Sequence, residues 1–336
     1  MVEISGKVST TQELTTGTPQ GSRLSPLLFI ILMADMDLWA GNSIISNFAD
    51  DTQTIHISEN TENLLETTRK EANNIIKFFE CNNLMNNADN AALLYNSKGK
   101  GNCITIKDIV GENVESRYSE QLLGLYINSN FDWCTHVEKI SIDLKKRIGL
   151  LRRIKHRVPK DKLLMIAEAI FNSKIRYGCS VYLNPVYDRE ELKMKKLSKN
   201  ASHLQVLQNS MLRIVFGYKI KQHINMEQLR NKIRMFSVNQ MCIYHTLLEA
   251  YNVTRYSSSE CIKRKWENKN QNQYSLRSKT TDDLIIPEKP VTKCSGFSYN
   301  GAKLFNKLPE NIRKTSSLSN FKALIKTWIW QQIPSY

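Results

Sequence analysis

The stretch from Gly17 to Asp51 constrains the fold of this chain more than any other part of its sequence. It begins with a Gly-Thr-Pro-Gln-Gly-Ser run at residues 17–22, where two glycines allow a tight turn and a close backbone approach. Ser25 and Pro26 then form a good helix start, because serine caps free amides and proline tolerates the first helical position. The apolar residues from Leu27 to Trp39 predict one buried helix.

Two adjacent aspartates, Asp50 and Asp51, follow this helix at the expected tip of a β-hairpin. Residues 43–49 are rich in apolar and branched side chains and predict a buried strand, and residues 52–57 alternate as a second strand. Phosphoryl transfer by magnesium ions needs carboxylates of this kind to hold hard cations. Aspartate is also common in turns for local hydrogen-bonding reasons, so the pair by itself also fits an ordinary turn.

Taken together, these motifs resemble the active site of reverse transcriptases of non-LTR retrotransposons, the LINE-like and jockey-like RNA-directed DNA polymerases. Gly17 to Phe29 resembles the segment that lies against the template and the incoming nucleotide, and Phe48 to Asp51 resembles the metal-binding turn. The resemblance implies an α+β fold. It would be a polymerase palm, truncated at its N-terminus, with an antiparallel sheet and helices, followed by an α-helical thumb and a helical C-terminal region.

The resemblance also implies functional residues. The reaction would transfer deoxynucleotides to a DNA primer on an RNA template, with two Mg²⁺ ions in the intact family. Asp50 is the expected direct metal ligand and Asp51 its supporting carboxylate. The residues expected to position the template base and the nucleotide are Pro19, Gln20, Gly21 and Ser22. Gln121 to Asn128 resembles the primer grip, with Leu123 and Gly124 at its turn.

The chain carries 47 Lys and Arg against 32 Asp and Glu, a net charge of +15, which favours a polyanionic partner such as nucleic acid. Basic residues are densest in the helix expected after Trp133. The apolar stripe of that helix is Val137, Ile140, Leu144, Ile148 and Leu151. The residues expected to contact a nucleic-acid backbone are Lys145, Lys146, Arg147, Arg152 and Arg153. A solvated charged face is the alternative interpretation.

Four further segments predict helices, at residues 60–81, 160–177, 200–218 and 226–251. The first of them is amphipathic. Its apolar positions at helical spacing are Leu65, Ala72, Ile76 and Phe79.

At 336 residues the chain has room for about two domains. The pattern predicts a partial palm at 1–132, a thumb-like helical domain at 133–251, a polar linker at 252–299 and a helical C-terminal segment at 300–336. The apolar run from Leu24 to Ala34 is shorter than the roughly 20 residues that span a bilayer, and the N-terminus lacks a signal-peptide core. We therefore expect an intracellular protein, in the nucleus or cytoplasm, without a membrane partner.

Two functions stay open at the level of the sequence. One is an active polymerase, and the other is a catalytically inactive remnant that binds nucleic acid. The family's first metal-binding aspartate has no counterpart before Gly17. Asn90 stands where the family has a lysine that can protonate the departing pyrophosphate, which an amide cannot do. These departures favour the inactive remnant for the chain by itself.

Overall fold

A computed structural model of the chain describes residues 3–10, 17–18, 21–85, 91–96, 104–109, 112–185, 198–219, 222–267, 283–288 and 296–333. The chain divides into two compact units, residues 1–117 (unit 1) and 118–336 (unit 2). Helices and small sheets are both present, so the protein is of the mixed α+β class, as the sequence predicts. Residues 118–132 belong to unit 2, whereas the sequence pattern grouped them with the residues before them.

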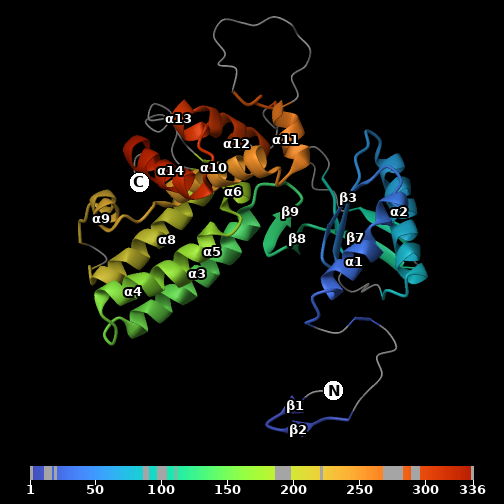
Figure 1. The fold of residues 1–336 in the computed structure, drawn as a ribbon, viewed down its shortest axis with the longest axis horizontal. Coiled ribbons are helices and arrows are strands. Elements are labelled where there is room, and N and C mark those ends of the chain that lie inside the picture. Colours follow the sequence, from blue (N-terminus) through green and yellow to red (C-terminus); the bar gives the residue numbers. More distant parts are fainter. Residues whose placement is uncertain are drawn as a thin grey trace, which may run out of the picture. The chain divides into compact units, whose positions relative to one another are not determined.

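Unit 1 combines short strands with one long helix (Figure 1). Its elements are β1 (Glu3–Ile4), β2 (Lys7–Val8), α1 (Ser25–Met33), the 3₁₀ turn η1 (Met36–Leu38), β3 (Ile44–Phe48), β4 (Asp51–Ile55), α2 (Thr61–Cys81), β5 (Leu93–Leu94), β6 (Thr105–Ile109) and β7 (Glu112–Arg117). Strands β1 and β2 form one antiparallel hairpin, and β3 and β4 form another. The third sheet has the order β5-β7-β6, in which β5 runs parallel and β6 antiparallel to β7.

Helix α2 confirms the helix predicted at residues 60–81. Asn60 caps it, because the Asn60 side chain accepts a hydrogen bond from the Glu62 backbone N–H. The buried face, however, is one residue out of step with the predicted stripe. The buried positions are Thr68, Glu71, Ile75 and Phe78, while the predicted apolar positions are only partly buried. A polar residue, Glu71, therefore occupies the centre of the packed face.

Helix α1 differs from the buried helix predicted between Leu27 and Trp39. It ends at Met33, and η1 follows after a break at Ala34 and Asp35. Only Met33 is buried in α1, whereas Ile30 is 65% exposed. The helix is apolar on all sides, but the core of unit 1 covers only one of them; that core consists of Met33, Met36, Ile75 and Phe78.

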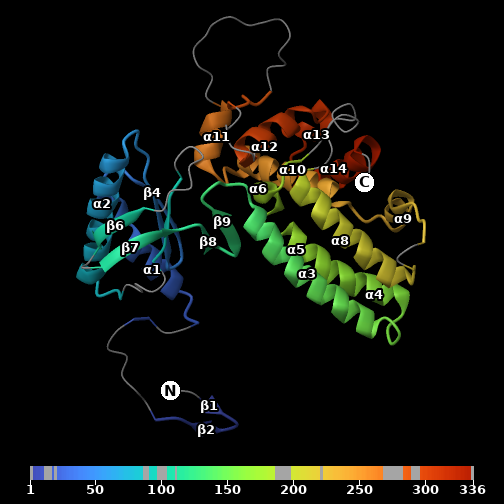
Figure 2. The ribbon, with the colours of Figure 1, turned by 180° about the vertical axis from the view of Figure 1, so that it is seen from behind.

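Unit 2 consists of a β-hairpin followed by helices (Figure 2). Its elements are β8 (Ser119–Leu122), β9 (Leu125–Asn128), α3 (Cys134–Ile154), α4 (Lys160–Ala167), the π-helical turn η3 (Glu168–Asn172), α5 (Ser173–Arg176), α6 (Cys179–Tyr182), α8 (Lys199–Phe216), α9 (Met226–Ile233), α10 (Val238–Tyr256), α11 (Glu260–Glu267), α12 (Gly296–Asn306), α13 (Glu310–Arg313) and α14 (Leu318–Gln332). Helix α3 packs against α8, and α10 packs against α12 and α14.

The apolar stripe predicted for α3 is confirmed, because all five of its residues are buried in the larger core cluster of unit 2. A second cluster forms around the later part of α10 together with α12 and α14. In the range predicted as a polar linker, the structure instead contains α11, whose Trp266 is 2% exposed. Over the described residues, every helix is too short or too polar to cross a lipid bilayer.

Two predicted helices contain interruptions. The segment predicted at 226–251 breaks between α9 and α10, where Arg234 adopts a φ of 51°. Ser237 and Gln240 then form a capping box that starts α10, so the break is encoded locally. The segment predicted at 160–177 is helical throughout 160–176 but widens into the π-helical turn η3 in its middle.

One buried and one partly buried histidine predict that unit 2 loses stability in mild acid. Burial lowers the pKa of His136 to about 4, and the nearby charge of Lys174 acts in the same direction. The His136 Nδ1 accepts the Tyr126 backbone N–H at 3.2 Å, which requires a neutral ring. The pKa of His245 is also lowered to about 4, mainly by burial. Between pH 6.5 and about 4 the unfolded chain therefore binds more protons than the folded chain, so stability is full above pH 6.5 and decreases as the pH falls.

We expect His136→Asn, which keeps an acceptor for the Tyr126 N–H, to make this decrease shallower without abolishing it, because His245 contributes in the same range. Urea unfolding at pH 7.5, 5.5 and 4.5 measures the effect. His203→Asn is the matched control, since His203 is exposed on α8. Identical pH profiles for the two variants would contradict the assignment to His136.

Candidate functional site

Asp50 and Asp51 lie at the tip of the β3–β4 hairpin, where the sequence predicts them. Phe48 pairs with Asp51, so Ala49 and Asp50 form the two-residue connection between the strands. Both aspartates are exposed. The strand leading to them is less buried than predicted, with Phe48 64% exposed, because the two-stranded sheet is packed only in part.

The backbone at this tip is strained. Ala49 has a φ of 52°, a left-handed conformation that disfavours any residue with a Cβ atom. In a two-residue hairpin connection, a positive φ at the first position is normally occupied by glycine. The strain is therefore concentrated on the residue next to the two carboxylates, and such strain is often found at functional sites.

The two carboxylates supply oxygen donors of the kind that Mg²⁺ prefers. Magnesium is commonly held by one or two carboxylates together with substrate phosphates, so Asp50 and Asp51 fit one such ion. A two-metal site needs more ligands than this pair. Among the described residues, no group of three or more His, Cys, Asp or Glu side chains is arranged to hold a metal. The hairpin tip thus offers part of the donor set that the family resemblance implies.

The turn before α1 is described only in part, because Pro19 and Gln20 lie outside the described residues, as does Asn90. Gly17 and Gly21 have φ angles of 80° and 82°, a conformation that needs glycine. The predicted cap at Ser25 is wrong: Ser25 is the first helical residue and Leu24 precedes it without a side-chain cap. Ser22 instead accepts the Leu24 backbone N–H at 3.2 Å.

Leu123 and Gly124 form the tight turn of the β8–β9 hairpin. Their φ angles are 45° and 78°, and the flanking residues Leu122 and Leu125 pair across the hairpin. The Tyr177 hydroxyl donates to the Leu123 carbonyl at 2.6 Å. A Cβ on Gly124 would lie 3.3 Å from the Tyr177 ring, so glycine permits this close approach. The turn is thus fixed from within unit 2, with both of its residues exposed.

The basic residues of α3 have two different environments. Lys145, Lys146, Arg152 and Arg153 are exposed. Lys145 and Arg152 are seven residues apart and form one row along the helix. Lys146 and Arg153 form a second row, and each row is about 10 Å long. Arg147 differs from its predicted role as a surface contact: it is partly buried, and its Nη1 donates to the Ile170 carbonyl at 2.5 Å. That hydrogen bond ties α3 to the π-helical turn.

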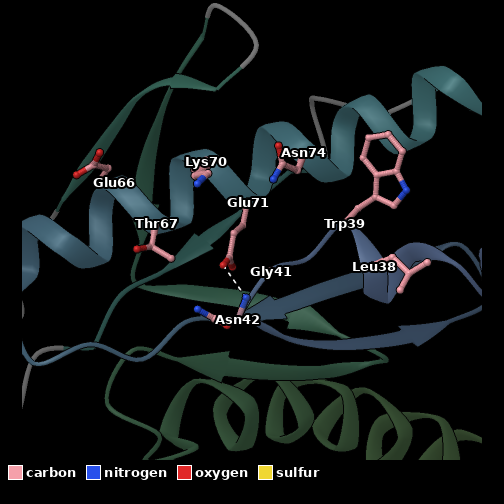
Figure 3. A pocket seen from close by; sticks show the side chains of 9 residues that line it. All are labelled: Leu38, Trp39, Gly41, Asn42, Glu66, Thr67, Lys70, Glu71 and Asn74. Carbon is pink, nitrogen blue, oxygen red and sulfur yellow. Dashed lines mark hydrogen bonds between the residues drawn. The ribbon is translucent and has the colours of Figure 1, made fainter.

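A groove of about 570 Å³ in unit 1 was not apparent from the sequence (Figure 3). Glu71 of α2 points toward Asn42, and its Oε1 accepts the Asn42 backbone N–H at 3.0 Å. Its Oε2 lies 3.1 Å from His56 Nδ1, and the other ring nitrogen of His56 lies 3.0 Å from the Thr54 hydroxyl. Burial lowers the pKa of His56, while the Glu71 carboxylate opposes this shift. Glycine is favoured at position 41, because its φ is 62° and a Cβ would lie 2.7 Å from Glu71 Oε1.

Glu71 and His56 were missed because nothing local distinguishes them. Glu71 lies among other charged residues of an amphipathic helix, and His56 is one of the polar positions of an alternating strand segment. The one available signal was the helical spacing of Glu71 with Ile75 and Phe78, which places all three on one face.

Comparisons of the chain with protein-family models, with curated proteins and with solved structures give no match. The functional assignment therefore depends on the residues themselves.

The strain at Ala49 gives a direct test of the hairpin geometry. We expect Ala49→Gly to raise the free energy of unfolding of unit 1 by about 0.5–1 kcal/mol, because glycine adopts a positive φ without steric cost. Ala72→Gly, in the middle of α2, is the matched control and should lower it by about 1 kcal/mol. Urea unfolding measures both. If both substitutions destabilise alike, Ala49 does not have the left-handed conformation.

Proposed function

We propose that this chain is a nucleic-acid-binding protein of the non-LTR reverse transcriptase type. In this proposal unit 1 is palm-like, and the helices that follow residue 133 are thumb-like. The RNA template and DNA primer would be its partners. The observation that carries the proposal is the exposed basic face of α3 formed by Lys145, Lys146, Arg152 and Arg153.

The position of this face on α3 supports binding to a phosphate backbone. The opposite side of α3 is buried, with Leu144 and Leu151 fully enclosed, so the helix is a rigid support. The nearest carboxylate on the helix, Asp143, lies 3.6 Å from Lys174 of α5 and is partly neutralised there. Four cations in two rows can therefore follow a strand of phosphates without an acidic neighbour between them.

Binding of this kind depends on salt because each neutralised phosphate releases condensed counterions. Replacing Lys145, Lys146, Arg152 and Arg153 by Gln keeps helix propensity and removes four charges. We expect weaker binding to an RNA–DNA duplex, and a slope of log affinity against log salt that is smaller by up to about 3 to 4. Fluorescence anisotropy across a salt titration measures the slope. Arg147 is retained, because it holds the Ile170 carbonyl.

The matched control replaces four exposed lysines elsewhere in unit 2 by Gln, namely Lys219, Lys232, Lys265 and Lys322. Its net charge equals that of the first variant. If both variants change the slope equally, overall charge rather than the α3 face governs binding, and the proposed interface is rejected.

The Asp50 and Asp51 hairpin favours a second candidate function, template-directed nucleotidyl transfer. Asp50 would be the direct ligand of Mg²⁺, and Asp51 its supporting carboxylate. The ion would stabilise the charge that develops on the transferring phosphoryl group. The exposure of both carboxylates leaves them accessible to a nucleotide's phosphates.

This second candidate predicts that the purified chain extends a DNA primer on an RNA template with Mg²⁺ and deoxynucleotides. Replacing both Asp50 and Asp51 by Asn should abolish extension, because amides do not compensate the charge of the metal. Gel analysis of the extended primer measures the activity, and circular dichroism confirms that both proteins are folded. No extension by the folded, unsubstituted chain would reject catalysis and leave the binding function.

A further inference from the structure

A second cavity, of about 1000 Å³, lies within unit 2 and has no part in the functions proposed above. Its walls come from α4, the π-helical turn η3, α5, the segment between α9 and α10, the start of α10 and the end of α14. Its volume is at the upper end of the usual range for small-molecule sites, about 300–1,000 Å³.

Aromatic rings form one side of this cavity. Phe236 contacts two other rings, with its centroid 5.6 Å from that of Tyr244 and 5.0 Å from that of Trp330. All three side chains line the cavity and remain partly exposed. Partly exposed rings in a cavity can stack against a flat ligand, and base–aromatic stacking of this kind needs no particular base.

The charges around the cavity favour an anion. Arg176, Arg234 and Lys326 line it, against a single carboxylate, that of Glu168. That carboxylate is already engaged by Arg176 in an ion pair and by the Asn172 amide at 2.5 Å. Lys326 and Arg234 are both exposed, and Lys326 Nζ lies 5.8 Å from the centroid of the Tyr244 ring. A cation thus sits beside the aromatic surface, where a phosphate next to a stacked base would lie.

A second wall of the cavity is held in place before any ligand binds. It contains the π-helical turn, and turns of this kind are frequent at functional sites. Asn172 at the end of that turn is fully buried, and its Oδ1 accepts the Gln208 Nε2 at 3.2 Å. Arg147 satisfies the Ile170 carbonyl of the same turn. A cavity whose wall is already ordered loses less conformational entropy when a ligand binds.

We infer that this cavity binds an unpaired nucleotide, with its base against Phe236 and Trp330 and its phosphate near Lys326 and Arg234. The nucleotide comes either from a single strand or from free solution, since both present the same base and phosphate. The inference rests on the proposed nucleic-acid-binding function and extends it from paired to unpaired strands. It uses none of the basic residues on the α3 face.

The test uses the full chain and a labelled single-stranded oligonucleotide ten residues long, with binding followed by fluorescence anisotropy. We expect Lys326→Glu to weaken binding about tenfold or more, because it reverses the charge beside the aromatic surface. Lys322→Glu is the matched control: it makes the same charge change one turn earlier on α14, at a position that does not line the cavity. It should change binding less than threefold.

Trp330→Leu tests stacking and should also weaken single-strand binding about tenfold. If this variant does not fold, the comparison of Lys326→Glu with Lys322→Glu still decides the outcome. Equal affinities for those two variants would overturn the inference.

Two further measurements distinguish a bound single strand from a free nucleotide, and the cavity proposal from the proposed nucleic-acid-binding function. Competition by a mononucleotide such as dATP at millimolar concentration identifies free nucleotide as a ligand, and its failure assigns the cavity to a strand. Duplex binding should be unchanged in Lys326→Glu, because it depends on the α3 face. If Lys326→Glu binds both the duplex and the single strand as the unsubstituted chain does, only the cavity proposal is rejected. If the unsubstituted chain binds neither, the proposed nucleic-acid-binding function is rejected as well.

Discussion

The arrangement of unit 2 depends on a chain of buried side-chain amides. Gln205 donates to the Gln208 side chain at 2.8 Å and accepts the backbone N–H of Val238 at 2.9 Å. Gln208 in turn donates to Asn172 and to the Phe236 carbonyl. A buried amide left without a partner costs about 1–3 kcal/mol, so the network fixes α8 against both the π-helical turn and the start of α10. These hydrogen bonds hold the walls of the cavity in place.

Unit 1 is stabilised by a small apolar core and by the contacts of one buried carboxylate. Its core contains few fully buried side chains, and Glu71 in the middle of α2 contacts the Asn42 backbone and the His56 ring. A buried carboxylate needs partners of this kind, so the segment after η1 and the residue that follows β4 both pack toward α2. The apolar faces of α1 receive no such cover within unit 1.

One helix links the two nucleic-acid surfaces proposed for unit 2. The buried stripe of α3 organises the larger core, and its opposite face carries the exposed cations. Between these faces, Arg147 donates to the Ile170 carbonyl of the π-helical turn, which forms a wall of the cavity. A widened turn frees carbonyl groups from the regular helical ladder, and a guanidinium can satisfy one of them. A residue that the sequence placed with the charged surface therefore has a structural role.

Local sequence pattern was enough to predict the hairpin that carries Asp50 and Asp51, the helix at residues 60–81 and the buried stripe of α3. Periodicity, turn residues and caps act over a few residues, so no knowledge of distant partners was needed. The burial of Glu71 and the inward direction of Arg147 could not be predicted in this way. These outcomes depend on which backbone carbonyls, amide groups and rings approach from elsewhere in the chain. The exposure of α1 also depends on tertiary contacts, because an apolar helix is buried only where neighbouring elements cover it.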